Sequence, residues 1–439
     1  MNGRNLWISL SLIFSLIWLG LFYHYNNLPG KSLDKYLTPK NNHNPFKNKT
    51  MGNTTGRPLI PRLSSKFNEM RALGIPLSME ELLQKGKDPA GNGAEKLKMA
   101  FELIHKAGES ALFSKLILKG EKPSDEELNK LFNDGQVQEI LDLALSVADM
   151  EYIDFDIDYS KGPATELPQL GSIRTLIKLM GLKVKAEING ESPESAVNYL
   201  NASIKLNDKA NDNLTLISSL VEIASYKFID ASLMALRERG FEVDLSKTQS
   251  LLEGQFNKSI KDFQKSIDGE RFLFGDWMFD KLINNKSEFS NTEIQSMFGE
   301  DYSKVASMTN EDLQSEYSEY LKSMVELRIN LEDPWYLSQS KIESIPKPQG
   351  ILYSMIMPAI SPSVKRLSEY NTQMKKSLLV LNIDKFKRTH GKFPESVDQL
   401  NQHPNFYVDD LTGEKYQIFE SEGQKYLGVS DNLDKAVKL

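Results

Sequence analysis

The chain has 439 residues, of which 40% are hydrophobic and 26% are charged, and its formal net charge is -7. This length leaves room for two or three domains. The acidic balance argues against a nucleic-acid-binding protein, which concentrates basic residues on one face. The absence of cysteine excludes disulfides, thiolate metal sites and cysteine nucleophiles, although it does not fix the compartment of the protein.

The chain begins with an uncharged apolar run, Leu6–Tyr23, that is just long enough to cross a bilayer as a helix. Trp7, Trp18 and Tyr23 lie near its ends, where aromatic side chains favour the lipid headgroups. Because no small-x-small cleavage site follows the run, residues 1–25 are predicted to be an uncleaved transmembrane anchor. A cleaved signal peptide is the alternative.

The orientation of this anchor is open, because two rules point in opposite directions. Positive residues follow the span at Lys31, Lys35 and Lys40, which under the positive-inside rule keeps the body cytoplasmic. A very short leading tail is nevertheless typical of signal-anchored proteins whose bulk is exported, so we expect a single-pass membrane protein with an extracytoplasmic body. Residues 26–63 are rich in Asn, Lys, Pro and Thr and predict a flexible linker.

Residues 64–362 predict a mainly α-helical domain, organised around three amphipathic helices in Leu167–Gly240. In these helices apolar residues recur at spacings of three and four, which places them on one face; the first has Leu170, Ile173, Ile177, Met180 and Val184. Antiparallel helices joined by short turns bury such stripes against each other. We therefore expect a helical array, with helix hairpins that loosely resemble a tetratricopeptide pair although a 34-residue repeat is not sustained.

Further helices are expected before and after this core. Ser78 and Ser124 each precede an acidic first turn, which is typical of a capped helix start. Helical periodicity also marks 94–107, 245–274 and 312–331.

Residues 152–159 have a different period. Apolar residues alternate there with three aspartates, Asp154, Asp156 and Asp158, which predicts a strand. Carboxylate oxygens suit calcium, but the rest of a binding loop is missing. We interpret the aspartates as one solvated edge.

Residues 363–439 predict a small α+β module, in which a long helix, Ser363–Arg388, precedes a hairpin with strands near 415–419 and 425–429. The turn and loop positions that define it are Phe386, Gly391, Phe393, Pro394, Asp410, Gly413, Tyr416 and Ser430. At these positions the module resembles the C-terminal region of type II secretion pseudopilins. The resemblance implies calcium near the C-terminus, where Asp409, Asp410 and Asp431 are the available ligands. The prepilin cleavage site is absent, which disfavours a pilus subunit.

Five short stretches carry a looser resemblance, which covers most of residues 64–430. They are Gly74–Ser78, Asn92–Ala94, the helix around Arg174, Asn213–Val221 and Gly269–Arg271. Together they are similar to a group of uncharacterised bacterial envelope proteins with a single N-terminal anchor. The resemblance implies architecture and localisation, and it brings no known activity.

No motif of known catalytic chemistry occurs in the sequence. The histidines show no metal-binding helical pair, and nucleophile elbows and dinucleotide loops are absent. We therefore predict no catalytic residue, no metal site and no cofactor. Glu270 and Arg271 precede an apolar segment and are candidates for binding a polar ligand, although such a pair is more often a structural ion pair. Arg174 is a third candidate, with a capping or helix-bridging role as its default.

Three functions are compatible with these features. The first is a non-enzymatic scaffold of the bacterial envelope, whose stacked helices present a groove to a protein partner. The second is an envelope hydrolase that uses carboxylates for catalysis, and the third is a component associated with a secretion system. An acidic cleft in the structure would favour the hydrolase, whereas an apolar groove would favour the scaffold.

Overall fold

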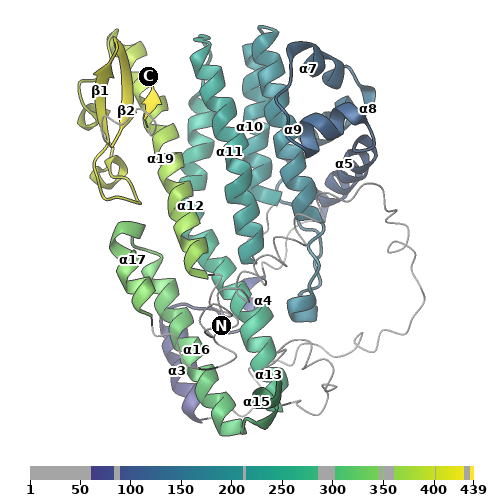
Figure 1. The fold of residues 1–439 in the computed structure, drawn as a ribbon, viewed down its shortest axis with the longest axis vertical. Coiled ribbons are helices and arrows are strands. Elements are labelled where there is room, and N and C mark those ends of the chain that lie inside the picture. Colours follow the sequence, from purple (N-terminus) through teal and green to yellow (C-terminus); the bar gives the residue numbers. More distant parts are fainter. Residues whose placement is uncertain are drawn as a thin grey trace, which may run out of the picture.

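The computed structural model describes residues 61–83, 89–210, 214–284, 302–345, 350, 360–400, 402–429 and 436–439. The protein is mainly helical and has a small three-stranded sheet at its C-terminal end, which confirms the predicted fold class in outline (Figure 1). The predicted anchor, Leu6–Tyr23, lies outside the described residues. Among the helices that are described, none is both long enough and apolar enough to span a bilayer.

The N-terminal part of the described chain consists of short helices. The bounds are Pro61–Ala72 (α3), Met79–Leu82 (α4), Ala94–Ala107 (α5), Ala111–Phe113 (α6), Asp125–Phe132 (α7) and Gly135–Ala148 (α8). Helix α3 begins at Pro61, so residues 61–63, which were predicted to belong to the linker, are helical, and residues 26–60 lie outside the described residues. Both predicted caps are confirmed: the Ser78 hydroxyl accepts the Glu81 amide, and Ser124 forms a reciprocal capping box with Glu127.

Five long helices stand side by side in the upper part of the molecule (Figure 1). They are α9 (Gln169–Asn189), α10 (Pro193–Ala210), α11 (Leu216–Glu238), α12 (Ser246–Glu270) and α19 (Ile360–His390). The three helices predicted between Leu167 and Gly240 are thus confirmed. Their apolar stripes are buried in one continuous core, in which Ile173, Ile177, Met180 and Val184 are almost fully enclosed.

The lower part of the molecule begins where α12 changes its winding. A π-helical turn, Arg271–Asp276 (η4), joins α12 to α13 (Trp277–Asn284) without a break. The remaining helices of this half are α15 (Tyr302–Ser307), α16 (Asn310–Asn330) and α17 (Trp335–Ser344). Helices α3 and α13 both pack against α16 (Figure 1). The first described helix, α3, therefore belongs to the lower part of the molecule.

The predicted strand at 152–159 is wrong. The only regular pairing there is an isolated bridge between Asn92 and Tyr152. Asp154 accepts a hydrogen bond from the amide of Asp156, which adopts a left-handed conformation at φ 56°, and Asp158 caps a following turn. Alternating side chains form a strand only beside a second strand, whereas aspartates readily bind their own backbone.

The C-terminal hairpin is confirmed and is extended by a third strand. The antiparallel sheet has the order β1 (Gln417–Ser421), β2 (Gln424–Gly428) and β3 (Val437–Lys438). Leu427 of β2 and Tyr416 pack with one face of α19 in a small core of their own. The last half of α19 is therefore shared between the helical array and this C-terminal module.

Candidate functional site

Arg271 occupies the first position of the π-helical turn, and its side chain is 1% exposed. Its guanidinium group donates a hydrogen bond to the carbonyl oxygen of Pro76, lies 3.7 Å from Met70 Sδ and stacks over the ring of Phe272. Pro76 lies 195 residues away in the sequence, in the loop that follows α3. Arg271 therefore ties the start of the described chain to the end of α12.

Buried acids balance this charge. Asp276 Oδ2 lies 3.8 Å from Arg271 Nε, and Asp276 Oδ1 accepts a hydrogen bond from the Tyr317 hydroxyl at 2.9 Å. Asp268 accepts one from Arg328 Nε at 3.0 Å. Burial raises the pKa of both aspartates, and the neighbouring guanidinium groups oppose that shift. The carboxylates of Asp268 and Asp276 therefore lie beside the guanidinium groups of Arg271 and Arg328. Such pairing is expected, because a buried charge without a partner is costly.

Gly269 and Glu270 hold α12 against the connection between α10 and α11. A Cβ atom on Gly269 would lie 1.8 Å from the carbonyl oxygen of Leu214, so only glycine allows this backbone approach. Glu270 Oε2 accepts the amide of Leu216, the first residue of α11, at 3.3 Å. Burial of this carboxylate raises the pKa of Glu270 to about 7.

Three of the short stretches singled out in the sequence therefore meet in space. Gly74–Ser78 supplies the carbonyl group that Arg271 binds, and the described part of Asn213–Val221 receives Gly269 and Glu270. Each stretch serves the same junction between the upper and the lower half of the molecule. Their roles are backbone contact, helix capping and charge balance.

The Glu270→Gln variant is expected to change the pH dependence of stability. Because the pKa is raised in the folded protein, Glu270 favours folding at low pH, and this contribution is lost as the pH rises from about 4.5 to about 7. Urea unfolding should show similar stability for variant and parent near pH 4, with the variant more stable by up to about 3 kcal/mol at pH 8. The control Glu126→Gln, at an exposed position of α7, should give no pH-dependent difference; the same flat result for Glu270→Gln would refute the assignment.

Arg174 lies in α9, apart from this junction. It is half-buried, and its Nε has no hydrogen-bond partner in the part of the chain that the structure describes. Lys178 lies one turn further along α9 and donates a hydrogen bond to the carbonyl oxygen of Ile117. Burial lowers the pKa of Lys178, and the positive charge of Arg174 lowers it further. No hydrogen bond or ion pair in the described ranges joins Arg174 to Glu270 or Arg271. The three candidate residues do not form one site.

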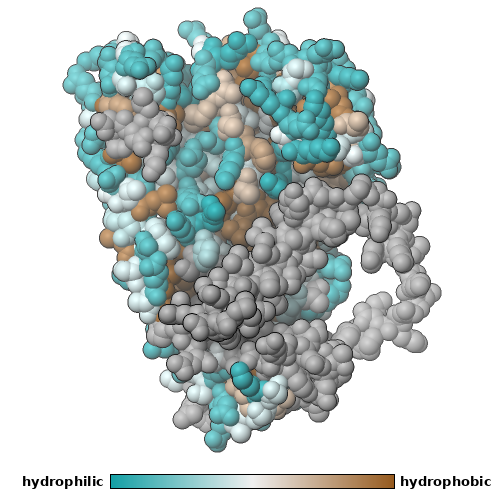
Figure 2. Space-filling model, viewed as in Figure 1, coloured by the Kyte–Doolittle hydropathy of each residue, from teal (hydrophilic) through white to brown (hydrophobic). Residues whose placement is uncertain are grey.

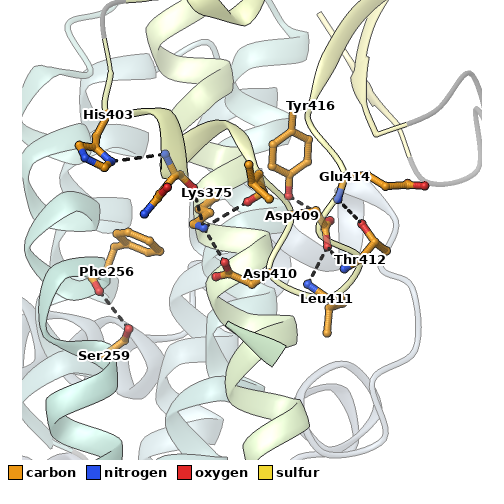
Figure 3. A network of polar contacts seen from close by, with 12 residues as sticks. Phe256, Ser259, Lys375, His403, Asp409, Asp410, Leu411, Thr412, Glu414 and Tyr416 are labelled. Atoms are coloured by element: carbon orange, nitrogen blue, oxygen red, sulfur yellow. Dashed lines mark hydrogen bonds and ion pairs between the residues drawn. The ribbon is translucent and has the colours of Figure 1, made fainter. Parts of the chain in front are cut away.

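A buried lysine that the sequence analysis did not single out fastens the C-terminal module to α19 (Figure 3). Lys375 Nζ donates to Asp410 Oδ1 at 2.6 Å and to the carbonyl oxygens of Asn405 and Val408 at 3.1 and 3.2 Å. Burial raises the pKa of Asp410, and the Lys375 ammonium group opposes the shift. The sequence signal was weak, because the polar residues Asn371 and Thr372 share the buried helix face of Lys375.

The neighbouring Asp409 also uses its carboxylate oxygens for hydrogen bonds within the protein (Figure 3). Asp409 accepts the amides of Leu411 and Thr412 at 2.8 and 3.1 Å and the Tyr416 hydroxyl at 3.1 Å. Asp431, the third residue considered for calcium, lies outside the described residues. Within the ranges that are described, no three His, Asp or Glu residues are grouped to hold a metal ion. Asp409 and Asp410 therefore shape and dock the loop.

A second polar cluster, also missed in the sequence, lies between α11, α12 and α19. Glu222, Asp262 and Tyr370 line a cavity of about 10 Å³, which is the space of one water molecule. Their spacing along the chain gave no signal, because the three residues come from three helices.

Comparison with protein-family models, with curated proteins and with solved structures found no match to this chain.

Proposed function

We propose that the protein is a non-enzymatic helical scaffold of the bacterial envelope, held at the membrane by Leu6–Tyr23 and bound to a protein partner. The observation that carries the proposal is the pairing of buried charges across distant helices. Arg271 donates to the carbonyl oxygen of Pro76 and Lys375 to Asp410, while Arg271 Nε lies 3.8 Å from Asp276 without a hydrogen bond among the described residues. Residues so engaged hold helices in place and are poorly placed to exchange partners with a substrate.

The carboxylate hydrolase is the weaker alternative. The acidic cavity at Glu222 and Asp262 measures about 10 Å³, whereas pockets for small organic ligands measure roughly 300–1,000 Å³. An organic substrate of that size does not fit into this cavity. The resemblance to secretion components stays a prediction, because it rests on the C-terminal module alone.

The corner between α16 and α17 offers a contact surface for a partner. Three large apolar side chains are exposed there. Ile329, near the end of α16, is 47% exposed, and Tyr336 and Leu337, at the start of α17, are 40% and 47% exposed. Trp335 and Ser338 of α17 are buried and hold this helix in position, and the Tyr336 amide donates to the carbonyl oxygen of Asp410 in the C-terminal module. In Figure 2 the two upper corners of the molecule are mostly hydrophilic, with tan and brown residues between them.

A cross-linking experiment tests this proposal. Since the chain has no cysteine, Leu337→Cys provides a unique attachment point for a short photoactivatable label on the full chain in its native membranes. We expect one cross-linked product of defined mass. The control is Gln339→Cys, an exposed position of the same helix whose side chain pairs only with Glu343.

The product should be absent or much weaker for Gln339→Cys. No product at Leu337→Cys, or the same products at both positions, would contradict a partner surface at the α16–α17 corner.

A further inference from the structure

Three helices of the upper array enclose the small cavity with oxygen-bearing side chains. Ser219 and Glu222 come from α11, Ser259 and Asp262 from α12, and Tyr370 from α19. Helical spacing explains the pairs on α11 and α12, because residues three apart lie on one helix face. The cavity is therefore lined by two carboxylates and three hydroxyl groups.

The hydroxyl of Ser219 is the most telling of these groups. The residue is 4% exposed, and its Oγ atom has no hydrogen-bond partner among the described residues, although burying an unpaired hydroxyl is costly. The Tyr370 hydroxyl donates to Glu222 Oε1 at 3.3 Å, and the Ser259 hydroxyl donates to the carbonyl oxygen of Phe256. Both hydroxyl oxygens keep lone pairs that can accept or coordinate.

Negative charge predominates on the cavity wall, because Glu222 and Asp262 line it and none of its lining residues is basic. Outside the lining, Lys258 lies near Asp208, Glu222 and Asp262, and Lys265 also acts on Asp262. Lys258 pairs with Asp208 and lies 3.7 Å from Asp262. Burial raises the pKa of Asp262, and the Lys258 charge only partly offsets this effect. The two carboxylates of the cavity wall would attract a positive ion into the cavity.

We propose that this cavity binds a sodium ion, held by Ser219, Glu222, Asp262 and the neighbouring hydroxyl oxygens. Hard cations prefer oxygen ligands of this kind. The cavity has room for one ion of about the size of a water molecule. Sodium is favoured over potassium because the smaller ion approaches the two carboxylates more closely and is therefore attracted more strongly. Two carboxylates beside an ammonium group are too few for calcium, which takes six to eight oxygen ligands. The bound ion links α11, α12 and α19.

The test is thermal unfolding of the full chain, purified in a neutral detergent, in sodium, potassium or choline chloride at equal ionic strength. A ligand that binds only the folded protein raises its melting temperature. We expect a value about 3 °C higher in sodium chloride than in choline chloride, with a smaller rise in potassium chloride. Equal melting temperatures in sodium and choline chloride would mean that the cavity holds water only and would overturn the proposal. An equal rise in potassium chloride would overturn the preference for sodium.

Two serine variants localise the effect. Ser219→Ala removes a proposed ligand and should abolish most of the sodium-dependent shift. Ser225→Ala is the matched control, because Ser225 is also on α11, is fully buried and has an unpaired hydroxyl, yet does not line the cavity. It should keep the full shift. A full shift in Ser219→Ala, or a loss of equal size in both variants, would refute binding at this cavity.

Discussion

Replacing Arg271 by methionine is expected to lower the free energy of unfolding by about 3–5 kcal/mol, because it removes one partner from a buried set of charges. Asp276 would be left beside an apolar side chain, and the carbonyl oxygen of Pro76 would lose its donor. Methionine keeps much of the length of the arginine side chain, so the loss reports charge and hydrogen bonding more than volume. Urea unfolding followed by circular dichroism measures it.

The matched control is Arg366→Met. Arg366 is also in a helix and contacts Glu369 at 2.6 Å, but its side chain is 61% exposed. Exposed pairs of this kind contribute less than about 1 kcal/mol. Should both variants lose the same small amount, Arg271 would not be a structural tie.

The second large effect is expected at Gly269. In Gly269→Ala the added methyl group would lie 1.8 Å from the carbonyl oxygen of Leu214. A backbone oxygen cannot turn away as a flexible side chain can, so α12 must shift from α11, and we expect a loss of at least about 3 kcal/mol in the free energy of unfolding.

Gly254 provides a control in the same helix. A Cβ atom there would meet nothing within 4 Å, and alanine favours a helix interior over glycine by roughly 0.5–1 kcal/mol. Gly254→Ala should therefore raise the free energy of unfolding, measured in the same urea experiment. Effects of the same sign at both positions would contradict the close approach at Gly269.

The helices could be predicted because their signals are local. The apolar period of Leu167–Gly240 and the caps at Ser78 and Ser124 act within a few residues, and the structure confirms them. The strand at 152–159 failed because pairing depends on a distant neighbour that this sequence does not supply. The π-helical turn at Arg271–Asp276 was also missed, because it leaves the apolar pattern almost unchanged.

The structural role of Arg271 could not be predicted from the sequence, because it also depends on a contact with a distant part of the chain. Its sequence neighbours suggested a ligand or an ion pair, but its strongest partner is a backbone carbonyl group 195 residues away. Backbone groups carry no residue-type signal. Lys375 and Ser219 carried little signal either, because buried polar residues share their helix faces, Asn371 and Thr372 beside Lys375 and Thr215 and Glu222 beside Ser219.

The central claim is that the buried charges around Arg271 hold the helices together. A double-mutant cycle with Arg271→Met, Asp276→Asn and the combined variant measures it most directly, through urea unfolding of the four proteins. We predict a coupling free energy of roughly 1–3 kcal/mol, so that the combined variant loses less stability than the sum of the two single variants. The claim that these buried charges hold the helices together would be contradicted if both single variants were as stable as the parent and the coupling free energy were zero.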